Sequence, residues 1–258
     1  MKTFLTFNKW SFYLILALCV GLMSCSDEDD DEGNGGGSAG NFGSTITITE
    51  DDETGVLKIS YDNQGRVSKI VGKWYDEYGD IEEMVTSTYT YSSDEITVVE
   101  IVQEDGDSYS ETTVYELDNR GLICASYEYY DGYGSDYVYY EYDGNKRLIS
   151  YGTASYMNPV QWDEKNILAE YEYHTGYDYY TNKLDEKGLN GLEYDFTDDY
   201  GVLYMQGYFG KKSANLLKSH SGGSYTYTWD GDKVKTMTGV YYDSYYGDSE
   251  RWTYTFNF

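Results

Sequence analysis

The chain has 258 residues, a formal net charge of −28 and 34 tyrosines, but only one proline and three cysteines. A surface this acidic repels polyanions, so the composition excludes nucleic acid as a partner. Two of the cysteines, Cys19 and Cys25, lie in the first 25 residues. This leaves Cys124, in an apolar strand-like run, as a small buried hydrophobic residue rather than a nucleophile.

Residues 1–24 have the pattern of a signal peptide. Lys2 and Lys9 precede an apolar run that extends from Phe12 to Val20, as in the positive and apolar regions of an export signal. The whole apolar stretch covers about a dozen residues, whereas about 20 are needed to span a bilayer. We therefore expect a cleaved signal and not a retained transmembrane helix.

The signal ends in Leu22-Met23-Ser24-Cys25, which resembles the lipobox of bacterial lipoproteins. The resemblance implies cleavage before Cys25, diacylglycerol on its thiol and acylation of the new N-terminus. Two or three acyl chains hold a protein on a membrane without a spanning segment, so a lipid membrane is the expected partner of Cys25. Cleavage removes two lysines and no acid, which moves the net charge from −28 to −30.

Residues 25–43 predict a lipidated tether, because the acidic run SDEDDDEG is followed by the Gly-rich stretch NGGGSAGNFG. The spacing of Asp27, Asp29 and Asp31 is that of an EF-hand, but Glu32 stands where that loop requires glycine. The acidic run resembles the signal that sends Bacteroidetes lipoproteins to the outer face of the outer membrane. A solvated linker is the alternative, and it leaves the periplasmic face open.

Residues 44–258 predict a single all-β domain, because side chains alternate with a period of two. In the last strand four aromatic residues share one face: Trp252, Tyr254, Phe256 and Phe258. Helical periodicity is confined to residues 213–219, where Ser213 would be the N-cap. The single proline agrees with a chain made mostly of hydrogen-bonded strands.

A degenerate turn motif recurs along this domain. Each copy joins an aromatic or apolar residue, an aspartate, a few turn residues and usually an aliphatic residue that begins the next strand. The copies are YDNQGRV (61–67), ELDNRGLI (116–123), EYDGNKRL (141–148), QWDEKNIL (161–168), KLDEKGLN (183–190) and TWDGDKVK (228–235). They predict an antiparallel β-meander of many hairpins, curled or closed into a barrel.

The turns resemble the Tyr-Asp repeats of large secreted toxins. With the lipobox, the tether and the aromatic last strand, the chain is more similar to a family of Bacteroidetes lipoproteins of unknown function with a porin-like fold. This resemblance implies a soluble porin-like barrel and brings no catalytic residues. A membrane-spanning barrel is not expected, because both faces of most strands carry Tyr, Thr, Asp or Glu, whereas a lipid-facing side must be apolar.

No motif for nucleophilic, phosphate-binding or metal chemistry is present, and the two histidines, His174 and His220, are isolated. We therefore expect no enzyme activity, no cofactor and no metal site. The number of carboxylates leaves a glycosidase pair open, because two acids about 5 to 9 Å apart suffice for glycoside hydrolysis.

Tyrosine clusters in residues 127–142, 171–180 and 241–246 suggest non-catalytic binding of a glycan or another extracellular ligand. The alternative is that they are ordinary cross-strand pairs of a structural or protein-interaction module, which would partner an outer-membrane complex or serve adhesion. The candidate ligand-binding residues are Trp74, Tyr130, Tyr133, Trp162, Tyr177, Tyr242 and Tyr245.

Overall fold

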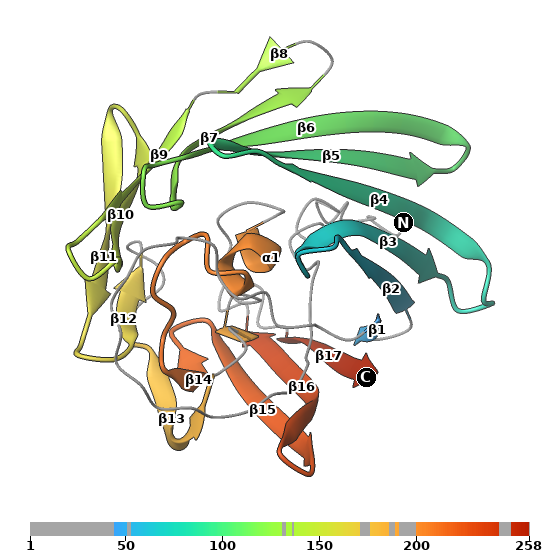
Figure 1. Ribbon diagram of the computed structural model, residues 1–258. Helices are drawn as coiled ribbons and strands as arrows, with labels where there is room; N and C mark the ends of the chain where they lie inside the picture. The colour runs from blue at the N-terminus through green and yellow to red at the C-terminus, as the bar shows by residue number, and fades with distance from the viewer. Residues whose placement is uncertain are drawn as a thin grey trace, which may run out of the picture.

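The computed structural model describes residues 44–50, 53–130, 133–135, 137–170, 176–185, 189–190, 200–242 and 249–257. Within them, 17 antiparallel strands form one sheet, and one helix, α1 (Tyr200–Met205), lies inside the ring of strands (Figure 1). The strands are β1 (Thr45–Glu50), β2 (Glu53–Tyr61), β3 (Val67–Tyr75), β4 (Ile81–Tyr91), β5 (Glu95–Glu104), β6 (Asp107–Leu117), β7 (Ile123–Tyr130), β8 (Tyr133–Gly134), β9 (Val138–Tyr142), β10 (Leu148–Thr153), β11 (Tyr156–Trp162), β12 (Ile167–Glu170), β13 (Asp178–Leu184), β14 (Asn215–His220), β15 (Gly223–Asp230), β16 (Lys233–Tyr242) and β17 (Ser249–Asn257).

The strands follow one another as a meander that curls into a nearly closed barrel. β1 pairs with β2 on one side and with β17 on the other, so Thr47 faces both Val56 and Thr255. β12 and β13 meet through a 3.3 Å hydrogen bond from the Tyr177 N–H to the Leu168 carbonyl. The predicted all-β meander and its porin-like curl are therefore confirmed.

Most of the apolar side chains point into the barrel. Ile46 and Ile48 of β1 are 2% and 5% exposed, and Tyr254 and Phe256 of β17 are each 1% exposed. The partly buried Trp252 packs against the same core, so the aromatic face predicted for the last strand is the inner face. Phe258 lies outside the described residues.

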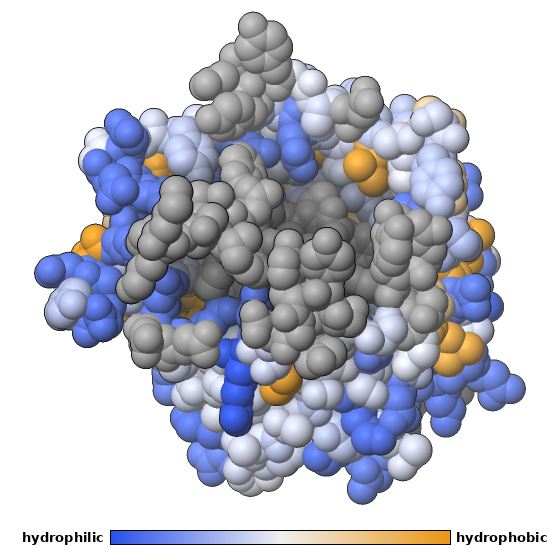
Figure 2. Space-filling view, turned by 180° about the vertical axis from the view of Figure 1, so that it is seen from behind, coloured by the Kyte–Doolittle hydropathy of each residue, from blue (hydrophilic) through white to orange (hydrophobic). Residues whose placement is uncertain are grey.

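The outer face is mostly polar. Threonines occupy it in register, with Thr226 opposite Thr238, Thr238 opposite Thr253, and Thr253 opposite Thr49. Threonine suits an exposed strand because its branched side chain fits the pleated surface, and its hydroxyl can bond across the strands, as those of Thr238 and Thr253 do at 2.9 Å. Figure 2 shows hydrophilic colours over most of the described surface seen from behind. This polarity is the reverse of a membrane-spanning barrel, whose outer band is apolar.

The segment from α1 to residue 214 fills part of the interior. Val202, Leu203 and Phe209 are at most 1% exposed. The helix predicted at residues 213–219 is wrong, because Asn215–His220 forms β14 and pairs with β13 and β15. Tertiary pairing overrides the local pattern there, while α1 is six residues long and apolar on every side, so it lacks an amphipathic signal. No helix among the described residues is long and apolar enough to cross a bilayer.

Candidate functional site

The antiparallel order places the connections at two opposite edges of the barrel. The repeat turns after β2, β6, β9, β11 and β15 all lie at one edge, which we call the turn edge. The described chain begins and ends near it, because Thr45 pairs with Asn257 and Ser44 accepts a hydrogen bond from Ile59 near the end of β2. The connections after β3, β5, β10 and β14 lie at the opposite, far edge. Ser44, the first described residue, therefore lies at the turn edge.

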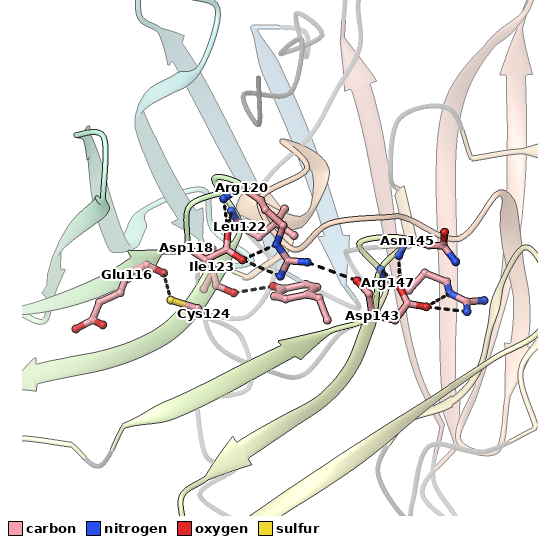
Figure 3. A network of polar contacts seen from close by, with 10 residues as sticks. Glu116, Asp118, Arg120, Leu122, Ile123, Cys124, Asp143, Asn145 and Arg147 are labelled. Atoms are coloured by element: carbon pink, nitrogen blue, oxygen red, sulfur yellow. Dashed lines mark hydrogen bonds and ion pairs between the residues drawn. The ribbon is translucent and has the colours of Figure 1, made fainter. Parts of the chain in front are cut away.

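Three of the repeat turns have the same arrangement of polar contacts. Figure 3 shows two of them, the Asp118 and Asp143 turns, side by side. Asp143 accepts hydrogen bonds from the backbone N–H groups of Asn145 and Arg147, and from Arg147 Nε at 2.7 Å. The Asp62 and Asp118 turns repeat this arrangement, each with its own arginine. Burial alone would raise the pKa of Asp143, but the Arg147 N–H and guanidinium lower it below its ordinary value. The predicted Asx-type turns are confirmed for these three copies.

Each of these turns is fastened to a neighbouring strand by an aromatic side chain. The Tyr142 hydroxyl donates to the Ile123 carbonyl at 2.7 Å, and the Arg120 guanidinium lies 5.5 Å from the centre of the Tyr142 ring. The same two contacts recur for Tyr91 with Val67 and Arg66, and for Trp162 with Leu148 and Arg147. The aromatic residues of two motif copies, Tyr142 and Trp162, together with Tyr91, therefore hold successive hairpins together.

Residues 206–214, which follow α1, connect these turns in chain order. The contacts run from Gln206 Oε1 to Val67 N, from the Tyr208 carbonyl to Ile123 N, from Lys211 N to the Lys146 carbonyl, from Ser213 Oγ to Ile167 N, and from Ala214 N to the Lys165 carbonyl. The segment thus satisfies backbone groups that would otherwise be buried without partners. We conclude that these contacts at the turn edge stabilise the fold.

The predicted ligand-binding residues do not form one site. Trp74 is 8% exposed, and its indole occupies the space that a Cβ at Gly72 or Gly55 would need. Trp162 lies at the turn edge, where its Nε1–H donates to the Leu148 carbonyl. Tyr177, also 8% exposed, packs edge-on against His220. Of the others, the structure places the backbones of Tyr130, Tyr133 and Tyr242 in β7, β8 and β16, whereas Cys25 and Tyr245 lie outside the described residues.

Four carboxylates lie on the inner side of β4 to β7, in the half of the barrel nearer the far edge. They are Glu83, Glu100, Glu111 and Glu128. Each lies two residues from a buried residue of its own strand and therefore on the same, inner face. Burial, together with the charges of Glu111 and Glu83, raises the pKa of Glu100 to about 7, although Ser87 opposes the rise by donating a 2.9 Å hydrogen bond. Glu111 stands directly opposite Glu100 across β5 and β6.

The outer side of the same wall carries an aromatic surface, which we call the tyrosine strip: Tyr127, Tyr129, Tyr137 and Tyr139. Tyr129 is 46% exposed, and Tyr137 and Tyr139 are each 40% exposed. The rings touch in succession, with centroids 5.2 Å apart from Tyr129 to Tyr127, 4.7 Å from Tyr127 to Tyr137, and 6.0 Å from Tyr137 to Tyr139. The outer side of β5, in the same wall, also exposes Val99 and Ile101, but the strip is a run of aromatic rings in contact.

The strip falls within the predicted cluster 127–142, but none of its four tyrosines is among the predicted ligand-binding residues. The signal for them is the period-two spacing of 127 with 129 and of 137 with 139. That signal is ambiguous by itself, because Tyr140 and Tyr142 occupy the opposite face and belong to the interior. Only closure of the barrel decides which set is exposed.

No group of three or more His, Cys, Asp or Glu side chains suited to a metal ion occurs in the described part of the chain. Cys124 is half-buried, and its Sγ lies 3.5 Å from the Glu116 carbonyl. Burial, then Asp118 and Glu116, raise the pKa of the thiol, which disfavours the nucleophilic thiolate. His174 lies outside the described residues, whereas His220 bonds Tyr225 at 2.8 Å.

The fold is similar to solved structures of porin-like proteins. A porin-like protein from Bacteroides uniformis matches with a TM-score of 0.56 and 13% identity, over 83% of this chain and 96% of that one. A second porin-like protein, from Bacteroides vulgatus, has a TM-score of 0.34 and 14% identity over 84% and 88% of the two chains. No protein-family model and no curated protein sequence matches. At this identity the likeness to the Bacteroides uniformis protein shows the fold alone: a nearly closed, porin-like antiparallel barrel.

Proposed function

We propose that this chain is a lipoprotein, anchored in the outer membrane through Cys25, whose barrel binds an extracellular ligand without catalysis. The observation that carries the binding function is the tyrosine strip, because four contacting aromatic rings on an outer sheet face supply large, rigid and amphipathic contact area. The lipobox and the acidic tether support the anchor and a location at the cell surface.

Binding is tested by affinity electrophoresis of the full-length protein in detergent against a panel of polysaccharides. We expect retardation in at least one gel and none in a gel without polysaccharide. Absence of retardation across the panel would count against a glycan ligand. It would favour the alternative, a structural or protein-interaction module, for which cross-linking on intact cells should capture one dominant outer-membrane partner.

Anchor and location are tested separately. Cells that express the protein should incorporate radiolabelled palmitate into it, and Cys25→Ser should abolish the label. Protease added to intact cells should degrade the barrel if it faces outward. Protection until the cells are lysed would place the protein on the periplasmic face instead.

A carboxylate-based glycoside hydrolase is the second candidate, favoured by one specific observation. Glu100 and Glu111 face each other on the inner wall, where directly opposed Cβ atoms lie about 5 Å apart. Burial raises the pKa of Glu100 to about 7, as suits a general acid. Release of reducing sugar from the panel, abolished by Glu100→Gln and by Glu111→Gln, would establish this activity. Unchanged polysaccharide would dismiss it.

A further inference from the structure

The register of the outer wall places two carboxylates in line with the tyrosine strip. Glu95 pairs with Glu116, Glu116 with Ala125, and Ala125 with Tyr139, so these residues form one row across β5, β6, β7 and β9. All of them project outward, because the alternate residues Ile96, Tyr115, Ser126 and Tyr140 face the interior. Ala125 separates the acids from the ring by one short side chain.

The rings themselves form an elongated, stepped row and not one flat surface. Tyr137 and Tyr139 are stacked within 18° of parallel with their centres 6.0 Å apart, whereas Tyr127 lies at 44° to Tyr137 and at 88° to Tyr129. An extended sugar chain can follow such a row, because Tyr129, Tyr137 and Tyr139 are each at least 40% exposed. Tyr127 and Tyr129 extend the aromatic surface from the adjacent strand. A side chain or a single cation would use one ring and not the row.

The charges select among ligands of this shape. Glu95 and Glu116 accept hydrogen bonds well and repel anions, and the chain as a whole carries a net charge of −28. An acidic polysaccharide would meet repulsion both at long range and at the strip. A neutral chain has apolar ring faces for the tyrosines and donor hydroxyls for the carboxylates.

We infer that the tyrosine strip, with Glu95 and Glu116 beside it, binds neutral β-linked polysaccharide. The sugars contact the exposed ring faces and edges of Tyr137 and Tyr139, and hydroxyls at the edge of the chain donate hydrogen bonds to the two carboxylates. This inference rests on the proposed binding function and adds to it the site, the ligand class and the role of each residue.

The test compares the binding of barley β-glucan, polygalacturonate and oligolysine by the full-length protein in detergent. We expect β-glucan to bind and the other two not to bind. The double variant Tyr137→Ala/Tyr139→Ala should weaken β-glucan binding by about tenfold or more, the loss expected for two ring contacts. Glu95→Gln/Glu116→Gln should weaken it several-fold. Tyr156→Ala is the matched control, because Tyr156 is 59% exposed but lies elsewhere on the barrel.

The outcomes separate the site from the function. If β-glucan binds the tyrosine variants as well as the unaltered protein, the strip is not its site, although the proposed binding function stands. Binding of polygalacturonate or of oligolysine in place of β-glucan would overturn the ligand class. Binding of none of the three, nor of any other polysaccharide in the panel, would overturn this inference and glycan binding together. Should the double variant unfold, the single variants Tyr137→Ala and Tyr139→Ala apply the same test.

Discussion

Glu100→Gln is expected to stabilise the barrel at neutral and alkaline pH. The carboxyl of Glu100 lies against the inner wall with Glu111 opposite it, and its pKa rises from an ordinary value of 4.5 to about 7 in the folded protein. The folded state therefore binds more protons than the unfolded state between these two values, so the free energy of unfolding falls as pH rises through this range. A rise of this size corresponds to about 3 kcal/mol in the free energy of unfolding, and this stability is lost once the pH exceeds the folded-state pKa of about 7. Glutamine keeps the shape of the side chain and cannot ionise.

Urea unfolding of the two proteins measures the effect. At about pH 8 the variant should be the more stable protein by an amount approaching 3 kcal/mol, and at about pH 4 the two should differ little, because the carboxyl is then neutral in both states. Glu164→Gln is the control, since Glu164 lies exposed in the turn between β11 and β12 and the same change there should be neutral. A difference between Glu100→Gln and the unaltered protein that is the same at both pH values would refute the linkage.

Two further substitutions test the packing. Gly72→Ala should destabilise the protein by about 1–3 kcal/mol in urea unfolding, because the new Cβ would lie 2.4 Å from the Trp74 ring, whereas Gly144→Ala, with open space around its Cβ, should be neutral. Tyr142→Phe should cost about 1–2 kcal/mol, because it leaves the carbonyl at the start of β7 without its donor. The exposed Tyr156→Phe is its control, and equal losses in the two tyrosine variants would contradict the proposed lock between hairpins.

The sequence by itself determined the strands and their turns. Alternation of Trp252, Tyr254 and Phe256 with polar residues requires one buried and one exposed face, whatever the rest of the fold does. The Asp-containing turns depend on bonds between residues two to four apart, such as those of Asp143 to Asn145 and Arg147, so a short stretch of sequence contains all the information. A meander follows when every such turn returns the chain beside itself.

Only the tertiary structure decided what those turns and faces are for. Residues 200–214 lack a local signal, since their place is set by partners more than 40 residues away, such as Ile167 for Ser213 and Ile123 for Tyr208. Those partners make the turn edge structural. In the same way, the residue type of Trp162 suggests a ligand-binding side chain, but the structure shows that its indole N–H donates to the Leu148 carbonyl.

The choice between exposed and buried tyrosines also needed the closed sheet. Tyr139 and Tyr140 are neighbours of the same residue type, and a period of two places them on opposite faces without saying which face is outside. Closure of β1 onto β17 encloses Tyr140 at 4% exposure and leaves Tyr139 at 40%. Side-chain chemistry is local, whereas exposure depends on the whole ring of strands. The candidate site therefore became visible only once that ring was complete.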